Sequence, residues 1–101
     1  MTNDKRISEE TLHLLMESVG GAFVPEGGDV RGVLSVLISE TVRFRDKLLE
    51  DAGVVLTVGD TREAIDALEA FLSGKPFPST LTSEQKSLAQ IWVDRLTTFK
   101  S

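Results

Sequence analysis

The sequence predicts an all-α domain of four helices, and three observations lead to this fold class. Apolar residues recur in four separate segments at the spacing that places them on one face of an α-helix. Glycine and proline residues separate these segments, as they do at helix ends and turns. The chain has 101 residues and no cysteine, which suits one domain without disulfides. We therefore expect a single helical domain over residues 1–101, with residues 1–6 flexible.

The first helix is expected to begin at Ser8, whose hydroxyl can accept a hydrogen bond from a backbone N–H of the first turn. The acidic residues Glu9 and Glu10 suit the positive end of the helix dipole. The apolar residues that share one face of this helix are Leu12, Leu15, Met16 and Val19. Gly20 and Gly21 are expected to end the helix.

A long helix is expected over about residues 29–52, capped by the side chain of Asp29. Its apolar residues form two seams, separated by roughly a quarter turn. The first seam comprises Val30, Leu34, Leu37, Thr41, Phe44, Leu48 and Ala52, and the second comprises Ile38, Val42 and Leu49. A helix with two apolar seams needs two neighbours, so this helix is expected to organise the fold. Those neighbours can belong to the same chain or to a partner chain.

A short extended segment is expected at residues 54–58, because these residues are rich in β-branched side chains and follow Gly53, a residue suited to ending a helix. The third helix is expected to begin at Asp60, which can form a capping box with Glu63, and to end at Gly74. Its buried face is expected to contain Ala64, Ile65, Leu68, Phe71 and Leu72.

The fourth helix follows a turn that contains Pro76 and Pro78, and it is expected to begin with a capping box formed by Thr82 and Gln85. Its apolar face comprises Leu88, Ala89, Ile91, Trp92, Leu96 and Phe99. A four-helix bundle with short connections fits this order of elements. The alternative is a handshake dimer that resembles the histone fold in its element lengths alone, since no basic set of phosphate-contacting residues accompanies it.

Charge and hydropathy argue against several classes of partner and location. Eleven basic and sixteen acidic residues give a net charge of -5, which disfavours binding to nucleic acid phosphates. The apolar runs are far shorter than the roughly 20 residues that span a bilayer, and the N-terminal residues lack the apolar core of a secretion signal. We expect a cytoplasmic protein that binds neither nucleic acid nor membrane.

The best candidate for a metal or catalytic site is the set Glu10, His13 and Glu17 on one flank of the first helix. Glu10 and His13 match the Glu-x-x-His spacing of di-metal helical bundles, in which both side chains reach the same ion. A complete site needs further carboxylates from other helices or from a second copy. We therefore predict no catalytic residue, no metal and no cofactor. A small metal-dependent enzyme assembled at an oligomer interface is the alternative.

The remaining features favour a noncatalytic protein–protein interaction module that acts as a small adaptor, regulator or inhibitor of a larger protein. Arg45 lies between the two seams, where a guanidinium needs a partner within the fold or a place at an interface. We predict a homodimer whose contact involves the second seam and the extended segment. The predicted interface residues are Ile38, Val42, Arg45, Leu49, Val54, Val55 and Val58. Burial of these residues within one chain is the alternative.

Overall fold

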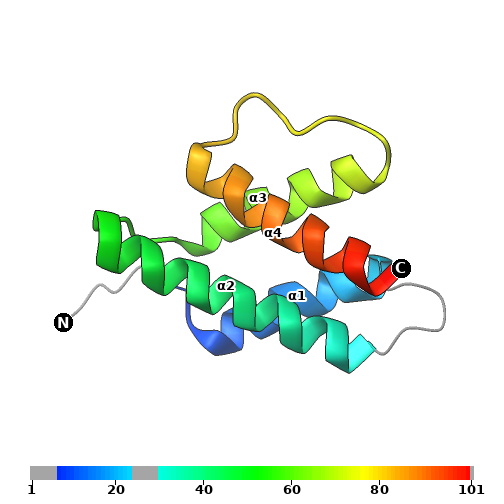
Figure 1. The fold of residues 1–101 in the computed structure, drawn as a ribbon, viewed down its shortest axis with the longest axis horizontal. Helices are drawn as coiled ribbons and strands as arrows, with labels where there is room; N and C mark the ends of the chain where they lie inside the picture. The colour runs from blue at the N-terminus through cyan, green and yellow to red at the C-terminus, as the bar shows by residue number, and fades with distance from the viewer. Residues whose placement is uncertain (1–6, 24–29, 101) are drawn as a thin grey trace.

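The structure, a computed structural model, describes residues 7–23 and 30–100 and is all-helical over them (Figure 1). The helices are α1 (Glu9–Phe23), α2 (Val30–Ala52), α3 (Val58–Leu72) and α4 (Ser83–Lys100). The described ranges contain no strand. The four-helix, all-α domain with a long second helix is therefore confirmed. The expected cap at Asp29 and the expected flexibility of residues 1–6 fall outside the described residues.

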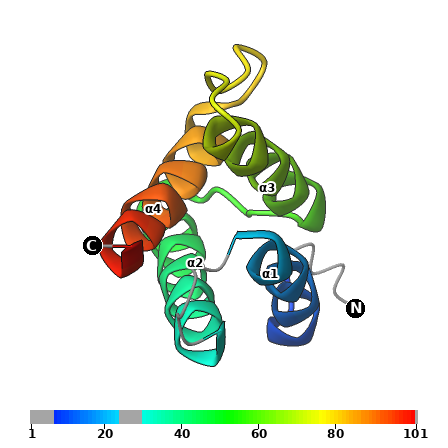
Figure 2. The ribbon, with the colours of Figure 1, turned by 90° about the vertical axis from the view of Figure 1, so that its right-hand side faces the viewer.

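Each helix packs against two of the others. The pair α1 and α2 is antiparallel, and α3 and α4 lie on the other side of the core (Figures 1 and 2). α1 contacts α2 and α3, and α4 contacts α2 and α3. α3 and α4 start at the same side of the molecule, so the connection 73–82 must run back across it (Figure 1). The long helix α2 thus finds both of its neighbours, α1 and α4, within its own chain, whereas a handshake dimer would need a second copy to close the core.

The core joins the apolar faces of all four helices. Its large and fully buried side chains include Leu12, Met16, Leu37, Leu56, Leu68, Leu88 and Trp92. Phe44 and Leu48 are partly buried and pack against this cluster. The expected burial of Phe71 is wrong, because its side chain is 41% exposed and its ring contacts Phe77 at a centroid distance of 5.2 Å. The neighbour of Phe71 is thus the connection that follows α3.

The first helix is longer than expected. α1 continues through Gly20 and Gly21 and ends at Phe23. A glycine inside a helix costs roughly 1 kcal/mol relative to alanine, which weakens a helix without necessarily ending it. At the other end, the expected cap is present, since the backbone N–H of Thr11 donates to Ser8 Oγ at 3.1 Å.

α3 begins at Val58, two residues before the expected start. Thr57 is the N-cap: its hydroxyl accepts a hydrogen bond from the Asp60 N–H at 3.1 Å, and Asp60 Oδ2 accepts one from the Thr57 N–H at 2.9 Å. Asp60 is therefore the acidic partner in the capping box and not the cap itself. The preceding residue, Leu56, is fully buried, which fixes the chain at the point where the helix begins.

Residues 53–57 connect α2 to α3 without forming a strand, so the expected extended segment has no strand partner within the described chain. Gly53 ends α2 with a φ of 68°. The Val54 N–H donates to the Leu48 carbonyl oxygen at 3.2 Å, and the Gly53 N–H donates to the Leu49 carbonyl oxygen at 3.1 Å. The Gly53 bond is the one that closes an αL type of helix end, and the positive φ explains why a glycine stands here.

Two polar links join helices across the core. Trp92 Nε1 donates to Thr41 Oγ1 at 2.7 Å, and this hydroxyl donates to the Leu37 carbonyl oxygen at 2.8 Å. Gln85 Nε2 donates to Asp60 Oδ1 at 3.0 Å and so connects the starts of α4 and α3. Among the described residues, every buried side-chain nitrogen and oxygen has a hydrogen-bond partner. The core is thus closed and satisfied within one chain.

Candidate functional site

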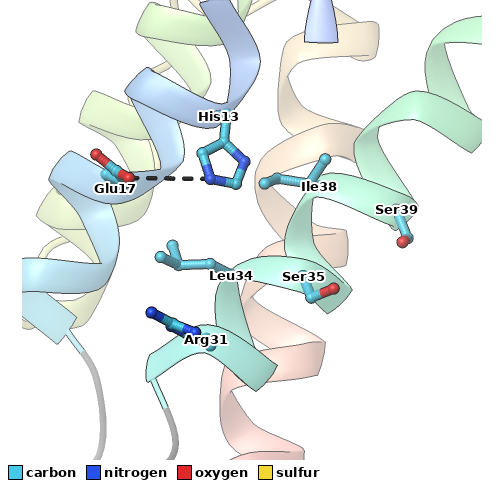
Figure 3. A pocket seen from close by; sticks show the side chains of 7 residues that line it. All are labelled: His13, Glu17, Arg31, Leu34, Ser35, Ile38 and Ser39. Atoms are coloured by element: carbon cyan, nitrogen blue, oxygen red, sulfur yellow. Dashed lines mark ion pairs between the residues drawn. The ribbon is translucent and has the colours of Figure 1, made fainter. Parts of the chain in front are cut away.

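An open groove lies between α1 and α2, with α3 and α4 behind it (Figure 3). It has a volume of about 490 Å³. Because the two helices are antiparallel, the middle of α1 lies beside the first half of α2. The side chains that line the groove are His13 and Glu17 from α1 and Arg31, Leu34, Ser35, Ile38 and Ser39 from α2. This groove is the candidate functional site.

The floor of the groove is apolar. Leu34 belongs to the buried core, and Ile38 is half-buried and packs against that core. Ile38 also begins the second seam, and Val42 continues that seam one turn along the same face of α2. Val42 is half-buried and packs against the core as well. The groove therefore opens onto a stripe of apolar side chains that is anchored in the core and still reaches solvent.

The walls of the groove are polar. On α1, His13 Nε2 lies 3.9 Å from Glu17 Oε2, and both side chains are more than half exposed. A protonated His13 would form an ion pair with Glu17, but solvent screens such a pair, so it contributes little to stability. On α2, the exposed side chains of Arg31, Ser35 and Ser39 line the groove. Figure 3 shows Arg31 extending toward α1 and the two serines turned away from it. His13, Glu17, Ser35 and Ser39 thus present polar groups at the surface of the groove.

The predicted metal or catalytic set is only partly brought together. His13 and Glu17 line the groove, whereas Glu10 lines a neighbouring shallow depression with Glu9, His13 and Leu14. Over residues 7–23 and 30–100, no group of three His, Asp or Glu side chains is arranged to hold a metal ion. One imidazole beside one carboxylate does not make a metal centre, since such sites need three or four protein ligands.

The seven residues predicted to form a dimer contact have different surroundings. Leu49, Val55 and Val58 are exposed at the junction of α2 and α3. Ile38, Val42 and Val54 are half-buried. The exposed group therefore belongs to the segment that joins α2 to α3 and to the helix ends beside it, whereas Ile38 lines the groove.

Arg45, the seventh predicted interface residue, has its partner within the fold. Its side chain is only 12% exposed. Nη1 donates a hydrogen bond to the carbonyl oxygen of Ile7, and Nε donates to Asp46 Oδ1 at 3.3 Å. The guanidinium thus ties α2 to the residues just before α1. Of the two roles expected for Arg45, this hydrogen bond supports the one within a single chain.

Sequence reasoning missed Leu14, which borders the depression next to the groove. Its side chain is 69% exposed, the largest value among the exposed large apolar residues of the described chain. The signal was present in the sequence, because Leu14 lies off the face shared by Leu12, Met16 and Val19. A leucine on the polar side of an amphipathic helix does not pack in the core, so a partner protein can contact it.

Comparisons with protein-family models, characterised proteins and solved structures find no match to this chain. None of the helices described is long and apolar enough to cross a membrane. The function must therefore be inferred from the groove, from the exposed apolar residues and from the charges around them.

Proposed function

We propose that this protein is a noncatalytic interaction module that acts as a small adaptor, regulator or inhibitor of a larger protein, and that the α1–α2 groove is its binding surface. The observation that carries the proposal is the apolar floor formed by Leu34 and Ile38, with the exposed Leu14 close by. Surfaces that bind another protein combine an apolar centre with a polar rim. The groove has both features.

The charge of the protein supports a protein partner rather than a nucleic acid. A net charge of -5 opposes the approach of a phosphate backbone, while it attracts basic protein surfaces. The chain has no cysteine and so has no need of an oxidising compartment, which supports a cytoplasmic location.

The proposal includes self-association through the α2–α3 junction. Leu49, Val55 and Val58 expose apolar surface there, and a second copy could cover it by a two-fold contact. Sedimentation velocity of wild type and Val55→Glu tests this contact. We expect a wild-type dimer and a folded Val55→Glu monomer, since Val55 is exposed and its replacement leaves the core intact. A wild-type protein that sediments as a monomer at high micromolar concentration would refute self-association.

Affinity capture from the native cell tests the function itself. Wild type, Leu14→Asp and Phe71→Asp are used as baits, and retained proteins are quantified by mass spectrometry. Phe71 is the matched control because it is an exposed apolar residue on α3 and does not line the groove. We expect a protein that is retained by wild type and by Phe71→Asp and is lost with Leu14→Asp. Identical retention by all three baits would contradict the proposed role of the groove.

A further inference from the structure

The shape of the groove suits a helix. α2 has 23 residues and is therefore about 34 Å long, and α1 lies antiparallel beside it. The apolar floor runs along α2 from Leu34 to Ile38, at a spacing of one turn. A partner helix laid along this floor inserts side chains at positions i, i+3, i+4 and i+7. A partner strand would need a sheet edge to pair with, and the described residues include no strand.

The charge beside the groove is acidic on the α1 side. Glu9, Glu10 and Glu17 are exposed, and the α1 sequence contains neither lysine nor arginine. Glu17 stands in the groove wall, and Glu10 stands in the depression that also holds Leu14. Lysine and arginine can place their apolar stems over a leucine and their charged ends beside a carboxylate. The α1 wall therefore complements basic side chains.

The α2 wall is different. Arg31 is the basic residue among the side chains that line the groove, and Ser35 and Ser39 are neutral. Positive charges on a partner are therefore expected to face α1.

We propose that the groove receives an amphipathic helix of a larger protein, with an apolar face bordered on one side by lysine and arginine residues. This inference rests on the proposed function and adds the chemistry of the partner. A second copy of this chain fits the groove less well, because it brings no basic residue on α1 and would place the same acidic α1 flank against Glu10 and Glu17. Self-association is accordingly assigned to the α2–α3 junction.

The test is a titration of isotope-labelled full-length protein with three synthetic peptides, followed by the backbone amide signals. The first peptide, about 18 residues and five turns long, has leucine on one face and lysine on the other. The second has the same composition in scrambled order, and the third keeps the leucine face but replaces lysine by glutamate. We expect the first peptide alone to bind, and the shifted amides to lie along α1 and the first half of α2.

Matched variants test the charge argument. In Glu10→Gln/Glu17→Gln, affinity for the leucine–lysine peptide should fall about tenfold, since two carboxylates that face lysine are lost. Glu63→Gln/Glu69→Gln changes the net charge equally on exposed positions of α3 and should bind as wild type. Leu14→Ser should also weaken binding about tenfold while the protein stays folded, as its amide spectrum shows.

Several results would overturn the inference. These are equal binding of the scrambled peptide, stronger binding of the glutamate peptide, shifts confined to α3 and α4, or an equal loss of affinity in the α1 and α3 double variants. Dissociation of a wild-type dimer by Leu14→Ser would show that a second copy occupies the groove. It is also possible to separate this inference from the proposed function. If no peptide binds, but the Leu14→Asp bait fails to retain a protein that the wild-type bait captures from the cell, the proposed function stands and the assignment of a basic helix fails.

Discussion

Replacing Thr41 by valine is expected to lower the free energy of unfolding by about 1–3 kcal/mol, because the indole N–H of Trp92 loses its acceptor. The two side chains are fully buried and share a hydrogen bond of 2.7 Å between helices α2 and α4. Water cannot replace the lost acceptor in a closed core, so the unpaired donor keeps its full desolvation cost. Valine has nearly the shape of threonine, so the change in packing contributes little.

Urea unfolding followed by circular dichroism measures this loss. With a slope of about 1–3 kcal/mol per molar urea, a loss of about 2 kcal/mol lowers the midpoint by about 1 M. The matched control is Thr98→Val, because the Thr98 hydroxyl donates to the Asp94 carbonyl oxygen at 2.9 Å in the same i to i-4 geometry but at the surface. The control should change stability by less than about 0.5 kcal/mol.

A double variant isolates the pair. The free energy of unfolding should fall less in Thr41→Val/Trp92→Phe than the sum of the falls in the two single variants, by about 0.5 kcal/mol or more. The reason is that the shared hydrogen bond can be lost only once. Equal midpoints for Thr41→Val and Thr98→Val, together with additive losses in the double variant, would refute the buried hydrogen bond.

Three further predictions test the core and the helix ends. Leu37→Ala should cost about 2–5 kcal/mol because the side chain is fully buried, and an unchanged urea midpoint would place it outside the core. Asp60→Ala should cost about 1–2 kcal/mol because its carboxylate joins the starts of α3 and α4, while Asp66→Ala, exposed on the same helix, should cost less than about 0.5 kcal/mol in the same assay. Gly53→Ala should lower the melting temperature, because Gly53 has a positive φ that alanine rarely adopts. The control Gly59→Ala should leave the melting temperature unchanged or raise it, because a Cβ there meets only ordinary contacts. A lower melting temperature for Gly59→Ala than for Gly53→Ala would contradict the left-handed end of α2.

The number and order of the helices could be predicted because each helix carries its own apolar face and its own end signals. The start of α4 shows this clearly, since the Gln85 N–H donates to Thr82 Oγ1 at 3.1 Å and the Thr82 N–H donates to Gln85 Oε1 at 3.0 Å, as a capping box requires. The start of α3 was misplaced because Thr57 and Asp60 both suit a cap. In the structure Thr57 is the cap and the preceding Leu56 is buried in the core, a tertiary contact that local sequence does not report.

The groove could be predicted only in part. The spacing of apolar residues placed Ile38 on a second face of α2, outside the first seam. It could not show that His13 and Glu17 of α1 line the same groove. The partner of Arg45 is the carbonyl group of Ile7, 38 residues away. Periodicity indicates which side of a helix is apolar, whereas the antiparallel pairing of α1 and α2 decides which residues face each other. The homodimer contact predicted from the second seam and from residues 54–58 stays a prediction.

Site-specific photocrosslinking in the native cell is the most direct test of the central claim, that the α1–α2 groove binds another protein. A photoreactive phenylalanine analogue is placed at Leu14 beside the groove or, as the control, at Phe71 on α3, both of which are exposed. We predict a discrete adduct of higher mass with a second protein from position 14 and none of the same mass from position 71. Absence of an adduct from position 14, or the same adducts from both positions, would contradict the assignment of the groove.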